Sequence, residues 1–160
     1  MRKIELNAIG LIHTPFKIRE GMPIQPTGAK GVKGTIIIES EFVEGLKDLD
    51  GFSHIILIYH FHKLKEYKLT LTPFMDDKPH GVFSTRAPKR PNHIGFSVVK
   101  LNKIEDNILY IENIDVLDKT PLLDVKPFIP AVDVVEVDKL GWLEGRSEKM
   151  GSKIADSRFS

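Results

Sequence analysis

Hydrophobic and polar residues alternate over short stretches along most of this chain, and turn residues separate the stretches. The longest apolar run covers residues 52–62 and is rich in β-branched and aromatic side chains. Such a run predicts a central strand that is apolar on both faces. A period of two gives it one face made of Ile55, Leu57, Tyr59 and Phe61, and another made of His54, Ile56, Ile58, His60 and His62.

Shorter segments of the same kind predict the other strands. They cover residues 4–12, 35–39, 66–74, 94–101, 108–112, 122–130 and 131–137. Between two of them, Phe42, Leu46 and Leu49 fall at helical spacing and indicate a short helix over 41–49. Seven or eight short strands with turns between them are typical of an antiparallel β-sandwich or β-barrel, so the fold class is mainly β with one or two short helices.

A Rossmann-type nucleotide fold is not expected. The chain shows no alternation of strands and helices, and no Gly-x-Gly-x-x-Gly motif follows a predicted strand. The tail over residues 138–160 is polar and either forms a short helix or frays, so residues 1–137 are expected to form the folded domain.

Composition narrows the class of protein. A chain of 160 residues with 41% hydrophobic and 28% charged residues fits one globular domain with a real core. The net charge of +1 does not indicate a general nucleic-acid binder, and the lack of cysteine excludes disulfides, thiolate metal sites and a cysteine nucleophile. No signal-like or membrane-spanning apolar run is visible, so a cytoplasmic location without membrane association is expected.

The stretch with the most distinctive chemistry is the basic loop, residues 85–93. Pro88 and Pro91 exclude a helix or a central strand there and stiffen the backbone around Arg86, Lys89 and Arg90. A stiff loop that carries guanidinium groups suits a pocket for an anionic or planar ligand, although a solvated surface loop has the same composition.

The histidines allow a second chemistry. His60 and His62 share one face of the predicted central strand, a spacing that two zinc ligands can use. No motif fixes a third ligand, so hydrogen bonding at the strand end or a pocket-lining role is favoured and no metal is predicted. Ser53 lacks the strand–turn–helix context of a nucleophilic serine.

Four segments resemble a known family. They are Asp50-Gly-Phe-Ser-His-Ile55, the pair Phe61-His62, the run Arg86-Ala-Pro-Lys-Arg-Pro-Asn-His-Ile-Gly95, and Asp118-Lys-Thr-Pro-Leu-Leu-Asp-Val-Lys-Pro127. In this order, over about residues 5–137, they are similar to the TsaA-like (TrmO, formerly YaeB) family. The resemblance implies a compact β-barrel that binds S-adenosylmethionine, a homodimer with the cofactor near its interface, and N6 methylation of threonylcarbamoyladenosine next to the anticodon of tRNA.

The resemblance also implies site residues. Cofactor contacts are expected from Pro23, Ile24, Gln25, His62, Lys63, Arg86, Phe96, Asp118, Lys119, Thr120 and Pro121. Contacts with the substrate or with RNA are expected from Lys30, Lys33, Lys89, Arg90 and Asn92. The acceptor nitrogen must lose a proton, and Asp124 or His62 is the candidate base; for Asp124 the alternative is a salt bridge with Lys126 or a loop arginine.

Three positions depart from the family pattern. Lys63 stands where glutamine is frequent, Lys119 where glycine is usual, and His93 where proline is common. Lys119 matters most, because glycine often supplies a positive φ in such a turn.

Two other functions remain open from the residues. A non-catalytic RNA-binding barrel would use Arg86, Arg90 and nearby lysines on phosphates, and its RNA binding would depend steeply on salt and not on the cofactor. A histidine-based metal hydrolase would need metal in the purified protein. The near-zero net charge weakens the first, and the missing third ligand weakens the second.

Overall fold

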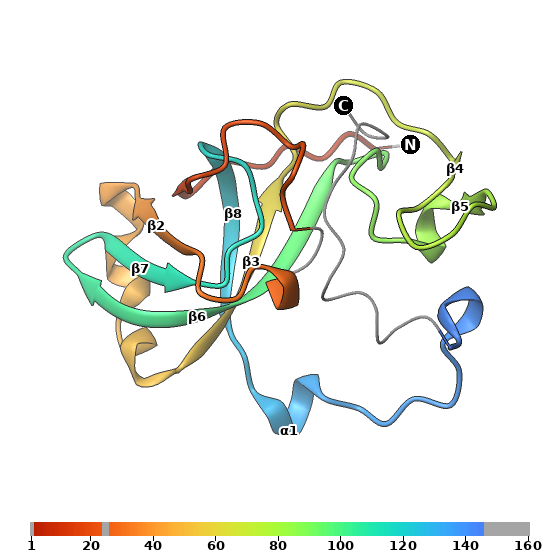
Figure 1. The fold of residues 1–160 in the computed structure, drawn as a ribbon. Coiled ribbons are helices and arrows are strands. Elements are labelled where there is room, and N and C mark those ends of the chain that lie inside the picture. Colours follow the sequence, from red (N-terminus) through yellow and green to blue (C-terminus); the bar gives the residue numbers. More distant parts are fainter. Residues whose placement is uncertain (1, 24–25, 146–160) are drawn as a thin grey trace.

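Six antiparallel strands close into a barrel in the computed structural model, which describes residues 2–23 and 26–145 (Figure 1). Around the barrel the strands follow the order β1-β2-β7-β6-β3-β8. Their bounds are β1 Gly10–His13, β2 Lys33–Ile38, β3 His54–His60, β6 Ile94–Glu105, β7 Ile108–Glu112 and β8 Thr120–Pro127. This arrangement confirms the predicted antiparallel, non-Rossmann β fold and selects the barrel over the sandwich.

Strand β3 is central, as its apolar run predicted. It pairs with β6 on one side and β8 on the other, and Ile55, Leu57 and Tyr59 point into the core with at most 4% of their surface exposed. The residues between them are half-buried, so the period of two is also confirmed. Burial of an Ile or Leu side chain of this kind contributes roughly 1.5–3 kcal/mol.

Short 3-10 turns and one α-helical turn connect the strands. They are η1 Pro26–Gly28, η2 Ser40–Leu46, η3 Leu49–Gly51, η4 Val82–Ser84, α1 Pro130–Asp133 and η5 Gly141–Leu143. The predicted helix over 41–49 is therefore wrong in detail, because the chain forms η2 and η3 with a break between them. The break lies at Asp48, whose φ of 65° is left-handed and cannot continue a right-handed helix.

Two predicted strands do not join the barrel. Of residues 66–74, only β4 (Thr70–Leu71) is a strand, and it pairs with β5 (His80–Gly81) in a separate small sheet. Residues 131–137 form part of α1 and then extended chain with Val132 and Val135 about 70% exposed. The physical reason is closure: β8 already pairs with both β1 and β3, so the barrel leaves no edge for another strand.

The first strand is also shorter than predicted, since it begins at Gly10 and Ile4 and Leu6 are exposed. None of the described helices is long and apolar enough to cross a membrane. The last described segment leaves the barrel after α1 and returns beside β4 and β5 (Figure 1). Residues 138–145 of the predicted tail thus hold η5, while 146–160 lie outside the described residues.

Candidate functional site

The basic loop is held in shape by one of its own arginines. Nη1 of Arg90 donates hydrogen bonds to the carbonyl oxygens of Val82, Thr85 and Ala87 at 3.1, 2.7 and 3.4 Å. The guanidinium also lies 6.0 Å from the ring centroid of Phe83. Part of the charge predicted for RNA is therefore used to fix the loop.

The end of the loop turns sharply at His93. Its φ is 50°, a value that the ring of proline cannot adopt, so the proline common in the resembling family is incompatible with this turn. The carbonyl of His93 accepts a hydrogen bond from the Phe61 N–H at 2.8 Å, and its Nε2 lies 3.0 Å from the Glu66 carbonyl oxygen. The loop is thereby anchored to the chain that follows β3.

A cavity of about 1040 Å³ lies beside the basic loop. Its walls come from the ends of β3 and β6, the basic loop, the segment before β8, and the last described turn, η5. Five cationic side chains and one carboxylate line it: Arg19, Lys63, Arg86, Arg90, Lys126 and Asp115. A cavity of this size is at the upper end of the range for small-molecule sites, and its charge favours an anionic group.

Arg86 and Phe96 form one wall of this cavity. The guanidinium carbon of Arg86 lies 4.9 Å from the centroid of the Phe96 ring, a cation–π arrangement, and Phe96 keeps 49% of its surface exposed. An exposed aromatic face beside a guanidinium suits a planar base next to an acidic group.

His62 lines the same cavity, and its ring carries an unpaired polar atom. Its Nε2 is buried and has no hydrogen-bond partner among the described residues. Burial lowers the pKa of the His62 imidazole, and the charge of Lys63 and the neighbouring His60 lower it further. Because a buried polar atom without a partner is costly, Nε2 is suited to receive a hydrogen bond from a ligand.

A hydrogen-bonded row of three side chains reaches the cavity, with Tyr59 and Asp115 on the cavity wall and Ser97 buried between them. The Tyr59 hydroxyl lies 3.0 Å from Ser97 Oγ, which donates to Oδ1 of Asp115 at 2.6 Å. Ser97 is buried on the core face of β6, and burial raises the pKa of the Asp115 carboxyl to about 6. Sequence reasoning missed this group, although a serine on the apolar face of a strand and an aspartate between Ile114 and Val116 are signals of it.

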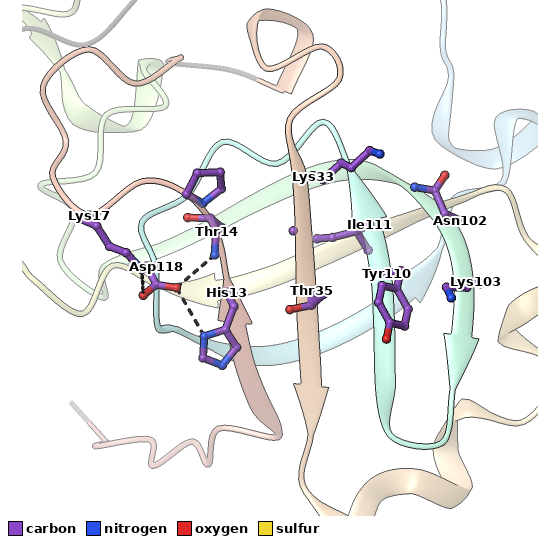
Figure 2. Close-up of a pocket in the computed structure, with 12 residues that line it drawn as sticks. His13, Thr14, Lys17, Lys33, Thr35, Asn102, Lys103, Tyr110, Ile111 and Asp118 are labelled. Carbon is purple, nitrogen blue, oxygen red and sulfur yellow. Dashed lines mark hydrogen bonds and ion pairs between the residues drawn. The ribbon is translucent and has the colours of Figure 1, made fainter.

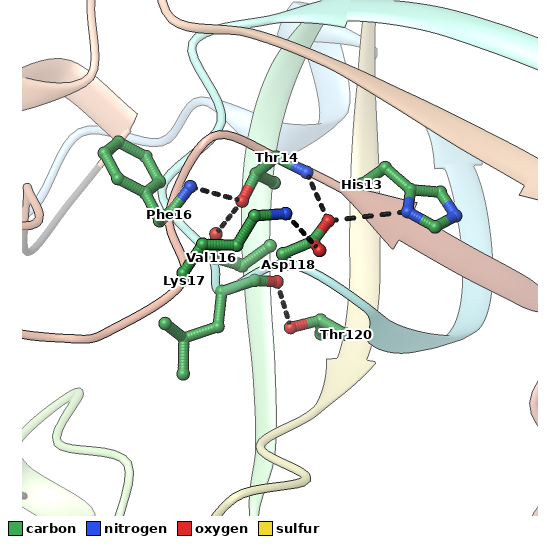
Figure 3. Close-up of polar contacts among 8 residues, drawn as sticks. His13, Thr14, Phe16, Lys17, Val116, Asp118 and Thr120 are labelled. Carbon is green, nitrogen blue, oxygen red and sulfur yellow. Dashed lines mark hydrogen bonds and ion pairs between the residues drawn. The ribbon is translucent and has the colours of Figure 1, made fainter.

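The turn before β8 is organised around Asp118, shown in Figure 3. Its carboxylate accepts hydrogen bonds from Lys17 Nζ at 2.5 Å and from the Thr14 N–H at 3.1 Å, and His13 lies 3.4 Å away. The hydrogen bond from Lys17 is the main reason that the pKa of Asp118 falls to about 2. Asp118 therefore ties this turn to the end of β1.

Asp118 faces a second cavity rather than the first. This cavity, of about 690 Å³, lies against β1, β2, β6 and β7, and Lys33, Thr35 and Tyr110 line it (Figure 2). Thr120, two residues later, is buried and lines the first cavity. The turn predicted to contact the cofactor is thus divided between two cavities.

The structure places the other predicted residues as follows. Pro23, His62, Lys63, Arg86, Phe96 and Thr120 gather around the first cavity, and Arg90 joins them. Asp124 lines neither cavity in the described chain and forms an ion pair with Lys126 at 2.7 Å. Pro121 lies in β8, Lys30, Lys119 and Asn92 are exposed, and Lys89 is half-buried in the basic loop. Ile24 and Gln25 lie outside the described residues.

Metal binding finds no support in the geometry. Within residues 2–23 and 26–145, no three His, Asp or Glu side chains converge on a point that could hold an ion. His60 faces the ring of His93 at 6.1 Å instead of a third ligand.

Lys119 adopts the left-handed backbone for which glycine is usual, with a φ of 60°. A residue with a Cβ in this conformation is strained by roughly 1–2 kcal/mol. Glycine removes this strain, but part of the gain in stability is lost because glycine increases the conformational entropy of the unfolded chain. We expect Lys119→Gly to stabilise the protein by about 0.5–1 kcal/mol in urea unfolding. Lys119→Ala keeps Cβ and should give no such gain; a less stable glycine variant would contradict the prediction.

The fold and the first cavity define a class of protein: a β-barrel with a cationic cavity that has an aromatic wall. Residues 11–134 match the family model for the tRNA-methyltransferase O N-terminal domain. The chain belongs to this family, which confirms the resemblance seen in the sequence.

Similar proteins support the same family. A probable S-adenosyl-L-methionine-binding protein of Pyrococcus abyssi is 52% identical over 151 residues, which cover 94% of this chain and 82% of that protein. The crystal structure of TrmO from Pseudomonas aeruginosa matches with a TM-score of 0.74 and 36% identity over 88% of this chain and 63% of the other. A mouse tRNA (adenine(37)-N6)-methyltransferase is 35% identical over 78% of this chain and 31% of its own length.

Proposed function

We propose that this protein uses S-adenosylmethionine to methylate N6 of threonylcarbamoyladenosine next to the anticodon of tRNA. The observation that carries the proposal is the first cavity, where Arg86, the open face of Phe96 and the unpaired His62 meet in a chain of the tRNA-methyltransferase O family. The Pyrococcus and mouse relatives, by their names, bind this cofactor and methylate adenine 37 of tRNA respectively.

The residues present fit the cofactor. Its carboxylate matches the cationic lining, its adenine matches the exposed Phe96 ring, and an amino or hydroxyl hydrogen matches the unpaired His62 Nε2. When bound, the cofactor supplies an electrophilic methyl group. The protein holds the acceptor nitrogen in line with this methyl group and excludes water. Alignment alone can remove several kcal/mol from the activation barrier.

The positive charge of the first cavity supports threonylcarbamoyladenosine as the acceptor. The threonylcarbamoyl group adds a carboxylate to the acceptor base, and the first cavity carries more cations than one cofactor carboxylate needs. The volume of about 1040 Å³ leaves room for a second planar group beside the cofactor. The competing reading as a non-catalytic RNA binder is weaker, because Arg90 is occupied by backbone carbonyls.

We expect Arg86→Ala to lose most of its affinity for S-adenosylmethionine while remaining folded. The guanidinium lies at the cavity wall and its removal takes both a charge and a contact with Phe96, a loss that corresponds to about 10-fold to 100-fold in Kd. Isothermal titration calorimetry on wild type, Arg86→Ala and the surface control Lys78→Ala measures this. A wild-type protein that binds no S-adenosylmethionine would remove the proposal.

The acceptor is tested separately by mass spectrometry of tRNA nucleosides after incubation with a labelled methyl donor. Two tRNA preparations are compared, one with threonylcarbamoyladenosine and one with plain adenosine at the same position. Label that appears only on the modified nucleoside supports the proposal. Label on plain adenosine would keep the methyltransferase and discard the threonylcarbamoyl substrate.

A homodimer and a cytoplasmic location are further proposals. The helix α1 and the segment after it expose Val132, Val134, Val135 and Val137 by 58–71%, a row of apolar side chains that a second copy of the chain would cover. Light scattering after size-exclusion chromatography tests the dimer.

A further inference from the structure

We infer that Asp115 is the base that accepts the proton from the acceptor nitrogen, and that Ser97 and Tyr59 are positioning residues that orient its carboxylate. This inference rests on the proposed function and names the residue that completes its chemistry. It replaces both candidates derived from the sequence, Asp124 and His62, with a residue from the segment between β7 and β8.

The direction of the hydrogen-bonded row follows from chemistry. An ionised carboxylate only accepts hydrogen bonds, so the Ser97 hydroxyl donates its one proton to Oδ1 of Asp115 at 2.6 Å. The Tyr59 hydroxyl, 3.0 Å from Ser97 Oγ, must then donate to Ser97. Tyr59 is 4% exposed and Ser97 1%, so both are held by packing. The row fixes the carboxylate without filling all of its lone pairs.

Asp115 faces the cavity without a counter-ion. No Lys, Arg or His forms an ion pair with it in the part of the chain that the structure describes, and it is the only carboxylate on the wall of the first cavity there. Burial raises the pKa of this carboxyl to about 6, which leaves it ionised at neutral pH yet able to take a proton. A base with a pKa near the working pH is the most effective one.

A carboxylate balances the charge of this cavity better than His62 does. Arg19, Lys63, Arg86, Arg90 and Lys126 line the same cavity, and the methyl donor itself is a sulfonium. A protonated His62 would add another positive charge, and the pKa of His62 is already lowered. Asp115 instead ends the step as a neutral acid, and while it is ionised its negative charge attracts the sulfonium donor.

The proton and electron balance is simple. The acceptor nitrogen forms a bond to the methyl carbon as the carbon–sulfur bond breaks and its electron pair stays on sulfur. The N–H proton moves to a carboxylate oxygen of Asp115, which becomes a neutral carboxylic acid and later returns the proton to water. No oxidant, metal or other reactant is needed.

The test compares wild type, Asp115→Asn and the exposed-carboxylate control Glu44→Gln. We expect Asp115→Asn to bind S-adenosylmethionine within about 2-fold of wild type in calorimetry, because amide and carboxylate have the same shape. Its single-turnover methylation of tRNA should be about 100-fold slower or more, the usual contribution of a general base. The wild-type rate should rise through an inflection near pH 6 that the variant lacks.

Ser97→Ala gives a second measurement that does not depend on turnover. The hydrogen bond from Ser97 lowers the pKa of Asp115, so its removal should move the Asp115 carboxyl titration in NMR to higher pH. The other titratable groups on this part of the cavity are His62, Lys63 and Tyr59. Burial raises the pKa of the Tyr59 hydroxyl. The methylation inflection should move by the same amount.

Three results would contradict the assignment of Asp115 as the base or the proposed function. An Asp115→Asn variant with the wild-type rate and pH profile, or one whose slow rate comes entirely from lost cofactor binding, overturns the assignment of the base. An unchanged inflection in Ser97→Ala overturns it as well, even where Asp115→Asn does not fold. Wild type that binds the cofactor but labels no tRNA overturns the proposed function itself.

Discussion

Replacement of Gly95, the second residue of β6, by alanine is expected to destabilise the protein by about 3 kcal/mol. A Cβ at this position would lie 2.5 Å from Cε2 of Tyr59 and 2.6 Å from Cζ of Phe61. Neither ring can retreat easily, because the two pack edge to face at 5.5 Å and the Tyr59 hydroxyl is bonded to Ser97. Overpacking of a rigid core typically costs 1–3 kcal/mol and sometimes more.

Thermal unfolding measures the effect, and Gly45→Ala is the matched control. Nothing lies within 4 Å of a Cβ built on Gly45, which sits in η2 on the barrel exterior. A loss of about 3 kcal/mol corresponds to a fall in Tm of roughly 6–12 °C in a chain of this size. Equal melting temperatures for the two variants would show that the rings move aside without cost.

The second large effect is expected from Arg90→Ala. The variant leaves three loop carbonyls without the guanidinium donor, and hydrogen bonds to a charged group contribute about 1.5–3 kcal/mol. We expect a loss of about 2 kcal/mol in urea unfolding together with a loss of S-adenosylmethionine binding, because the loop that carries Arg86 would no longer be fixed.

The salt dependence of tRNA binding separates this role from a direct phosphate contact. A residue that neutralises one phosphate changes the slope of log K against log salt by about one unit. Arg90→Ala should leave that slope unchanged, with Lys78→Ala as the charge-matched surface control. A stable variant with a reduced slope would make Arg90 a phosphate ligand, as the sequence predicted.

Much of the barrel could be predicted because its signal is local. The apolar run of β3 and the turn residues between the strands were enough to predict an antiparallel β fold. The wrongly predicted strands lie where the alternation of apolar and polar residues does not correspond to burial. Leu69 and Val135 sit in alternating runs, yet they are 59% and 71% exposed because the closed barrel has no free edge. Closure is a property of the whole sheet, and no short window of sequence contains it.

The candidate site was predicted in part for a similar reason. Arg86, Phe96 and His62 carry recognisable chemistry in motifs, and the structure brings them to one cavity. Asp115 was missed because its importance comes from partners 18 and 56 residues away in sequence, Ser97 and Tyr59. Asp118 was assigned to the cofactor, but its carboxylate holds Lys17 and faces the second cavity. Spacing along the chain does not reveal which side of a turn a carboxylate faces.

Trp142 donates a hydrogen bond from Nε1 to the Ser84 carbonyl oxygen at 2.7 Å and stacks on His80 at 4.6 Å, while Leu140 and Leu143 line the first cavity. One wall of the ligand chamber is therefore contributed by residues that leave the ribosome after all six barrel strands. A nascent chain can complete its barrel and still lack a finished chamber, so ligand capture follows translation of η5 instead of accompanying the folding of the sheet.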